Sequence, residues 1–154
     1  MALNTYAFHL GGLIANFHGL ELSLRIFLYK ALPRPHNASL DADFYSYEVG
    51  SFVDENMLTN YDSLGILFKK ANLVLKEKNA QLLDESLVDV RNALAHGRIS
   101  TESEEKPLRL LQYSKPRAGK VKITHNTILT DQWFIENKRR VVEAMMIVQP
   151  YIRS

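Results

Sequence analysis

The spacing of apolar residues changes along this chain, and that change limits the folds it can adopt. From about Thr5 to His96, outside a loop expected over residues 33–50, apolar residues recur every three or four positions, which is typical of amphipathic helices. Between Leu108 and Leu129 the period changes to two, as in half-buried strands, and the helical spacing then returns. We therefore expect a mainly α protein, a helical bundle of about four to five helices with a β-hairpin inserted before the C-terminal helix.

The expected helices follow from this period and from capping residues. The first ends at Pro33 and Pro35, and the third begins after Asp62 as its cap. Gly97 is expected to stop the fourth, and Pro150 to close the last. The predicted helices cover residues 5–32, 51–60, 63–75 and 80–96, and a last one that Thr130 or Asp131 caps.

Two strands are predicted over residues 108–113 and 120–129, joined around Pro116 and Gly119. In the second strand, alternation places Val121, Ile123 and His125 on one face, and for His125 we expect partial burial rather than a catalytic role. With 154 residues and no linker or internal repeat, residues 1–154 are expected to form a single domain.

Composition and motif searches exclude several classes of function. The chain has no cysteine, so disulfide scaffolds and cysteine-based zinc sites are excluded. It lacks the glycine-rich phosphate loops, HExxH and GxSxG, and no two histidines lie three or four positions apart. We expect no cofactor and no metal. No apolar run is long enough to span a membrane and the N-terminus does not resemble a signal peptide, so the expected location is the cytoplasm, with no membrane partner.

Charge is distributed unevenly. Residues 1–105 carry nine Lys and Arg against fourteen Asp and Glu, whereas residues 106–154 carry ten against three. The stretch 106–130, which contains the predicted hairpin, has no acidic residue. Such a segment is either a phosphate-binding face or a solvated basic hairpin.

The densest group of chemically capable residues is RNALAHGR, residues 91–98. At 100° per residue, Arg91 lies beside the stripe of apolar residues that faces the core. Four other polar residues lie on the opposite side of the helix and face outward. A cation is favoured at the C-terminal end of a helix, where His96 lies, and an imidazole there suits general acid–base chemistry. Arg91 suits bidentate binding of a phosphate. The alternative is an ordinary amphipathic helix that ends in histidine. The outward residues are Glu85, Asp89, Asn92 and His96.

Arg91, Asn92 and His96 at a helix end resemble the motif of the HEPN superfamily, in which arginine is followed by four to six residues and histidine. The resemblance implies a metal-independent endoribonuclease in a stress, defence or toxin–antitoxin setting. In that chemistry, His96 is the acid or base, Arg91 stabilises the charged phosphorane and Asn92 orients one of them. It also implies a homodimer in which two motifs form one cleft.

The same resemblance identifies the partners and one alternative. RNA is the expected substrate. The charge of the predicted hairpin, rather than the resemblance, makes Lys115, Arg117, Lys120 and Lys122 the expected RNA-binding residues. An antitoxin or a nucleotidyltransferase is a candidate protein partner. Some toxin branches have His-x-Tyr, whereas this chain has His-Gly-Arg. The alternative function is a non-catalytic HEPN-like module that binds a protein or a nucleotide.

Glu21 is the remaining candidate, because it lies on the apolar stripe of the first helix, where a carboxylate needs a partner. It is a candidate orienting residue for Arg91. Equally, it is paired within its own helix or reaches water.

Overall fold

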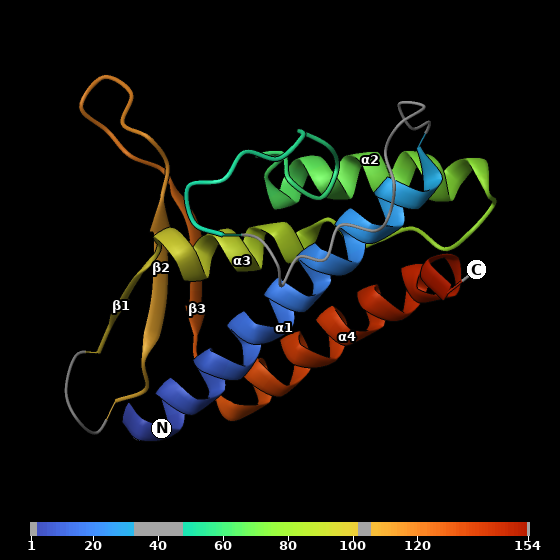
Figure 1. Cartoon of the computed structure of the whole chain (residues 1–154). Helices are drawn as coiled ribbons and strands as arrows, with labels where there is room; N and C mark the ends of the chain where they lie inside the picture. The colour runs from blue at the N-terminus through green and yellow to red at the C-terminus, as the bar shows by residue number, and fades with distance from the viewer. Residues whose placement is uncertain (1–2, 33–47, 102–105, 154) are drawn as a thin grey trace.

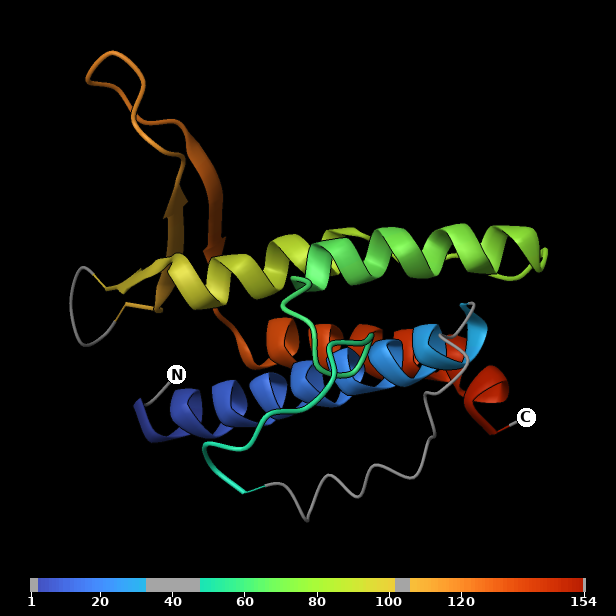
Figure 2. The same cartoon turned by 45° about the horizontal axis from the view of Figure 1, so that its top comes forward.

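The computed structural model describes residues 3–32, 48–101 and 106–153. In these residues the chain forms four helices and a three-stranded antiparallel sheet, so the expected mainly α class is confirmed (Figure 1). Helices α2 and α3 lie in one layer over the pair α1 and α4, and the sheet lies at one end (Figure 2). The predicted loop over residues 33–50 falls mostly outside the described residues. The elements are α1 (Leu3–Ala31), α2 (Leu64–Glu77), α3 (Ser86–His96), β1 (Arg98–Ser100), β2 (Arg109–Tyr113), β3 (Ile123–Ile128) and α4 (Asp131–Arg153).

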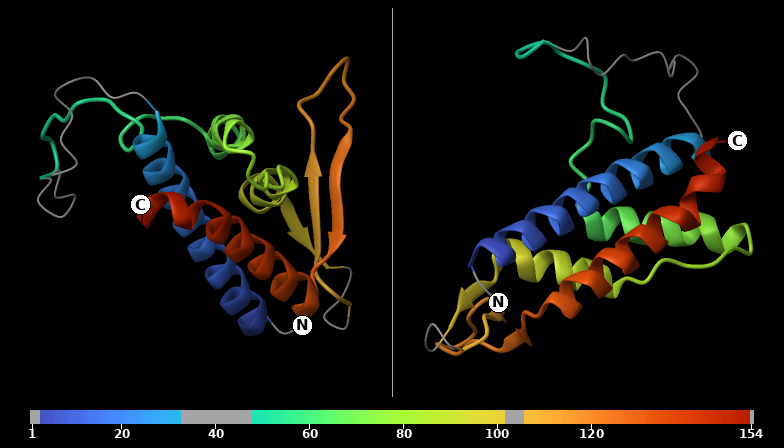
Figure 3. Two further views of the ribbon diagram at one scale, coloured as in Figure 1. Left: turned by 90° about the vertical axis from the view of Figure 1, so that its right-hand side faces the viewer. Right: turned by 90° about the horizontal axis from the view of Figure 1, so that it is seen from below.

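The two long helices α1 and α4 lie side by side and run in the same direction (Figure 3). At their N-terminal ends the ring of Tyr6 meets that of Phe134 edge to face, with centroids 6.0 Å apart. At their C-terminal ends Phe27 lies 5.7 Å from Tyr151. The predicted first helix is confirmed, and its apolar stripe forms much of the single core cluster among the described residues.

The start of α4 was predicted correctly and its end was not. Thr130 caps the helix by accepting a hydrogen bond from the backbone N–H of Trp133 at 3.0 Å. The helix then continues through Pro150 to Arg153. A proline so near the end removes only one hydrogen bond, and Tyr151 beyond it packs against the core, which offsets that loss.

The helix predicted over residues 51–60 does not form, because Arg25 of α1 holds this segment in another conformation. Its guanidinium donates hydrogen bonds to the backbone carbonyls of Met57, Asn60 and Asp62 at 2.9–3.2 Å. These carbonyls point at a side chain instead of along a helix axis. The cap of the next helix is Ser63, whereas the predicted cap, Asp62, pairs with Lys70 at 2.6 Å.

Helix α3 begins at Ser86, later than the predicted residue 80, because a side chain of α2 binds the intervening backbone. Asn72 accepts a hydrogen bond from the N–H of Leu83 at 2.8 Å and donates one to its carbonyl at 3.2 Å. This pair of bonds takes both backbone groups of Leu83, so the segment runs extended into α3. Arg140 of α4 bonds the carboxylate of Asp84 at 2.6 Å and lowers the pKa of that carboxyl.

The predicted hairpin is confirmed as β2 and β3, and a third strand, β1, joins it directly after α3. The pairing of β2 with β3 is regular up to Gln112 and His125, and then Tyr113 pairs with Ile123. Thr124 is therefore an extra residue, a β-bulge, which breaks the alternation of side chains. For this reason Val121 and Ile123 are exposed, whereas His125, predicted on the same face, is half-buried as expected.

Candidate active site

The outward face of α3 carries the polar group that the sequence places there. Leu87, Val90 and Ala93 are buried against the core. Opposite them, Glu85, Asp89 and His96 are exposed and Asn92 is half-buried. The helical period therefore predicted correctly which side of this helix meets solvent.

Arg91 is half-buried, and its guanidinium lies toward Asn92. Its Nη1 donates a hydrogen bond to Oδ1 of Asn92 at 3.2 Å. On a straight helix Arg91 and His96 are about 140° apart, whereas Asn92 and His96 are about 40° apart. The hydrogen bond therefore draws the guanidinium from the flank of the helix toward the side that carries His96.

The ion pairs among the described residues do not include Arg91. Its positive charge is thus balanced by no described carboxylate at contact distance, which suits a guanidinium that binds a phosphate. Gln112 of β2 donates a hydrogen bond to the backbone carbonyl of Asn92 at 3.3 Å, and this bond connects the backbone of Asn92 to the sheet.

His96 is the last residue of α3, and Gly97 connects it directly to the sheet. The backbone of Gly97 is extended, with φ −76° and ψ 170°, so it is not the left-handed stop that the sequence suggested. Glycine is needed at position 97 because there is no room for a side chain. A Cβ atom here would lie 2.3 Å from the carbonyl oxygen of Ala93 and 2.6 Å from a methyl group of Leu110. This close approach fixes the backbone that connects His96, the last residue of α3, to β1.

Glu21 is paired within its own helix, which was one of the alternatives. Its carboxylate accepts hydrogen bonds from Nε and Nη2 of Arg25 at 3.2 and 3.0 Å. The ion pair that Glu21 makes among the described residues is thus with Arg25, and the suggested role in orienting Arg91 has no support in these contacts.

The four candidate RNA-binding residues lie on the projecting end of the hairpin and are all exposed. The turn at its tip places Ala118 and Gly119 at φ values of 49° and 74°, which are typical of a type I′ turn. Arg98, at the start of β1, pairs with Leu111 near the end of β2. The hairpin tip therefore extends from the same end of the sheet as His96 (Figures 1 and 2).

A second basic run, residues 138–140 on α4, is engaged in contacts within the chain. Lys138 lies over the ring of Phe8, Arg139 pairs with Glu136 at 2.6 Å, and Arg140 pairs with Asp84. The charges of Arg139 and Arg140 are therefore compensated by carboxylates of the same chain.

Comparison of the chain with protein-family models, curated proteins and solved structures found no match to any of them. Among the described residues, no group of three or more His, Asp or Glu side chains is arranged to hold a metal ion. No helix in the described ranges has the length and apolar character needed to cross a membrane.

Sequence reasoning missed two features of this region. Strand β1 has only three residues, so its pattern is too short to detect. Arg98 of this strand lies over the ring of Tyr113, with its guanidinium carbon 5.4 Å from the ring centre. An arginine directly after the His-Gly pair was the available signal.

Proposed function

We propose that this protein is a metal-independent endoribonuclease that acts as a homodimer, with Arg91, Asn92 and His96 as its catalytic residues. The observation that carries the proposal is the Arg91–Asn92 hydrogen bond, which turns an arginine without a described carboxylate partner toward an exposed histidine. The resemblance to HEPN domains supports the same assignment.

The proposed reaction cleaves the bond between phosphorus and the 5′ oxygen of the following nucleotide. The ribose 2′ hydroxyl attacks the adjacent phosphate while an imidazole accepts its proton. Arg91 stabilises the negative charge that develops on the phosphorane oxygens, and Asn92 holds the guanidinium in place. A second acid protonates the departing 5′ oxygen. The products are a 2′,3′-cyclic phosphate and a 5′ hydroxyl, and no metal takes part in these steps.

Two copies of the chain supply what one copy lacks. An acid and a base are needed on opposite sides of the phosphorus, and α3 of one copy provides one histidine. Its polar outer face has little apolar area to drive association. We expect exposed apolar side chains of the neighbouring α4, such as Val142 and Met146, to complete the interface. Light scattering of the wild type should give a dimer, and Met146→Asp should shift it toward monomer.

The test of the chemistry is cleavage of a panel of labelled RNAs in the presence of EDTA. Wild-type activity should persist, and His96→Ala and Arg91→Ala should each lose it, by at least about a hundredfold. His18→Ala is the matched control, because His18 is an exposed histidine on α1, and it should cleave as the wild type does. The products should carry a 2′,3′-cyclic phosphate.

Cleavage that survives His96→Ala, or products with a 5′ phosphate, would contradict this mechanism. A folded wild-type dimer without activity on any RNA would favour the alternative, a non-catalytic module that binds a nucleotide or a protein such as an antitoxin or a nucleotidyltransferase. In either case the setting that the resemblance implies, stress response or defence, is part of the proposal.

A further inference from the structure

The small sheet has one face against the helices and one face open to solvent. Leu110 is fully buried, and Gln112 bonds the backbone of Asn92, so these residues of β2 point toward α3. Alternation turns their neighbours the other way. The open side is called the outer sheet face here, and its residues include Arg98, Ser100, Arg109, Leu111 and Tyr113.

One end of the outer sheet face is a stacked pair beside His96. Arg98 lies over the ring of Tyr113, which is 38% exposed, and the distance from the guanidinium carbon to the ring centre is 5.4 Å. Only Gly97 separates Arg98 from His96, so their Cα atoms are at most about 7 Å apart. Guanidinium and aromatic planes are the surfaces on which proteins stack unpaired bases. This pair therefore provides a stacking surface next to the proposed cleavage site.

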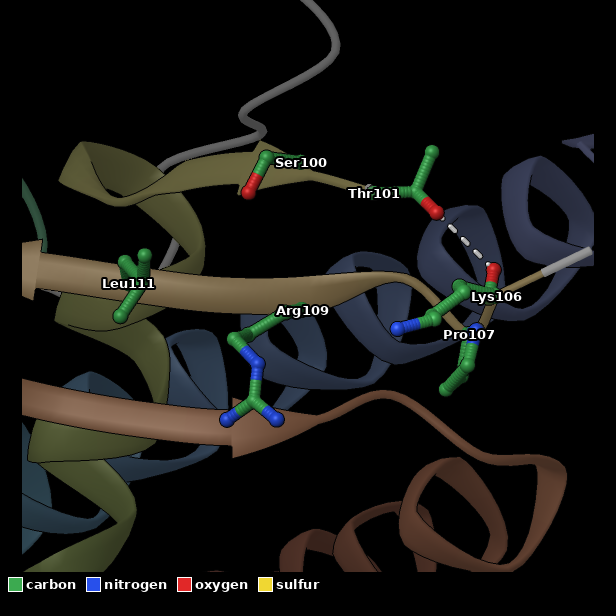
Figure 4. A pocket seen from close by; sticks show the side chains of 6 residues that line it. All are labelled: Ser100, Thr101, Lys106, Pro107, Arg109 and Leu111. Atoms are coloured by element: carbon green, nitrogen blue, oxygen red, sulfur yellow. Dashed lines mark hydrogen bonds between the residues drawn. The ribbon is translucent and has the colours of Figure 1, made fainter. Parts of the chain in front are cut away.

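The other end of the outer sheet face is a pocket of about 300 Å³, and its six described lining residues belong to β1, to β2 and to the positions directly beside these strands (Figure 4). Ser100 pairs with Arg109 across the strands, and both residues line the pocket. Thr101 donates a hydrogen bond to the carbonyl of Lys106 at 3.0 Å, which joins the two sides of the loop. None of the six described residues that line the pocket is acidic.

The guanidinium of Arg109 is fixed in position and can bind an anion in this pocket. Its Nη1 donates to Oδ1 of Asn126 on β3 at 2.6 Å, which fixes one edge of the guanidinium. Among the described residues Asn126 is the one acceptor for Arg109. The other N–H groups of this guanidinium are available to a ligand, and a guanidinium is the group that binds a phosphate with two hydrogen bonds.

We propose that the outer sheet face binds single-stranded RNA, with a base stacked on Arg98 and Tyr113 and a backbone phosphate in the pocket of Arg109. Arg98 and Ser100 lie on the same face of β1, about 7 Å apart, so both ends of the surface contact one strand. The strand must be single, because the faces of paired bases are hidden in a duplex. The inference rests on the proposed ribonuclease function and defines how its substrate is held.

The test is binding of a short fluorescein-labelled oligouridylate with 2′-O-methyl sugars, followed by fluorescence anisotropy. This RNA lacks the attacking hydroxyl, so its binding is measured apart from cleavage. Arg109→Gln should raise Kd by about tenfold and lower the slope of log Kd against log salt by about 0.7, the value for one lost phosphate contact. Tyr113→Leu should raise Kd by about tenfold without changing the slope, because stacking is not ionic.

Two controls separate these contacts from general effects. Tyr113→Phe keeps the ring and should bind as the wild type does, even if Tyr113→Leu lowers the melting temperature. Arg139→Gln removes an exposed arginine of α4 that pairs with glutamates, and it should leave Kd unchanged. Equal Kd values for the wild type, Arg109→Gln and Tyr113→Leu would overturn the proposal, as would a duplex of the same length that competes as well as the single strand.

The outcomes also separate this inference from the proposed cleavage. If the wild type cleaves no RNA but binding still depends on Arg109 and Tyr113, the ribonuclease function fails and the binding surface is supported. If cleavage depends on His96 but neither variant changes Kd, the cleavage function is supported and the inference about the outer sheet face is refuted.

Discussion

Gly97→Ala tests whether close packing at the end of α3 positions His96. The added Cβ would lie 2.3 Å from the carbonyl oxygen of Ala93, 2.6 Å from a methyl group of Leu110 and 3.0 Å from the carbonyl oxygen of Leu111. Two of these atoms belong to the backbone, and Leu110 is fully buried, so no side-chain rotation relieves the contacts. Overpacking of this kind costs about 1–3 kcal/mol, and we expect a value near the upper limit.

At about 3 kcal/mol, and about 2–4 °C per kcal/mol for a chain of this size, the melting temperature should fall by roughly 6–12 °C. Urea unfolding followed by far-UV circular dichroism measures the same loss. Gly11→Ala is the matched control, because nothing lies within 4 Å of its added Cβ and it is exposed inside α1. It should stabilise the protein by about 0.5–1 kcal/mol. An unchanged midpoint for Gly97→Ala, or a lowered one for Gly11→Ala, would refute this reasoning.

Three further predictions concern charge. Arg25→Ala should cost about 3 kcal/mol in urea unfolding, because it removes a nearly buried cation from one carboxylate and three backbone carbonyls; a loss below about 1 kcal/mol would contradict this. The hydrogen bond from Arg140 lowers the pKa of Asp84, so the stability from this pair is present above the unfolded pKa and is lost as pH falls from about 5. Asp84→Asn should therefore flatten the acid side of the stability profile, by at most about 0.5 kcal/mol because the pair is exposed; an unchanged profile would count against the pair. Reversing Lys120 and Lys122 to Glu should weaken RNA binding and its salt dependence without altering the melting temperature, and unchanged anisotropy titrations would exclude the hairpin tip from binding.

Several elements follow from sequence alone because they depend on local periodicity. The apolar spacing of α1 and α4, the alternation in β2 and β3 and the outward side of α3 each arise from repeats within a few residues. The cap at Thr130 is equally local, since its hydroxyl bonds a backbone group three residues away. These features required no knowledge of what packs against them.

The candidate site was predictable to the same extent. Its residue types and their side of α3 follow from the helical period. The direction of the Arg91 guanidinium does not, because a long side chain has several rotamers and only the contact with Asn92 selects one. The family resemblance supplied the proposed roles, which remain for the cleavage experiments to test.

Tertiary structure decided the features that depend on groups distant in sequence. Arg25 prevents a helix over residues 51–60 by bonding its carbonyls, and Asn72 delays the start of α3 by bonding Leu83. Strand β1 forms only because β2 offers it an edge. In each case a backbone group can bond either to a local partner or to a distant one. The folded arrangement selects between them, because only there are the distant donors and acceptors within bonding distance.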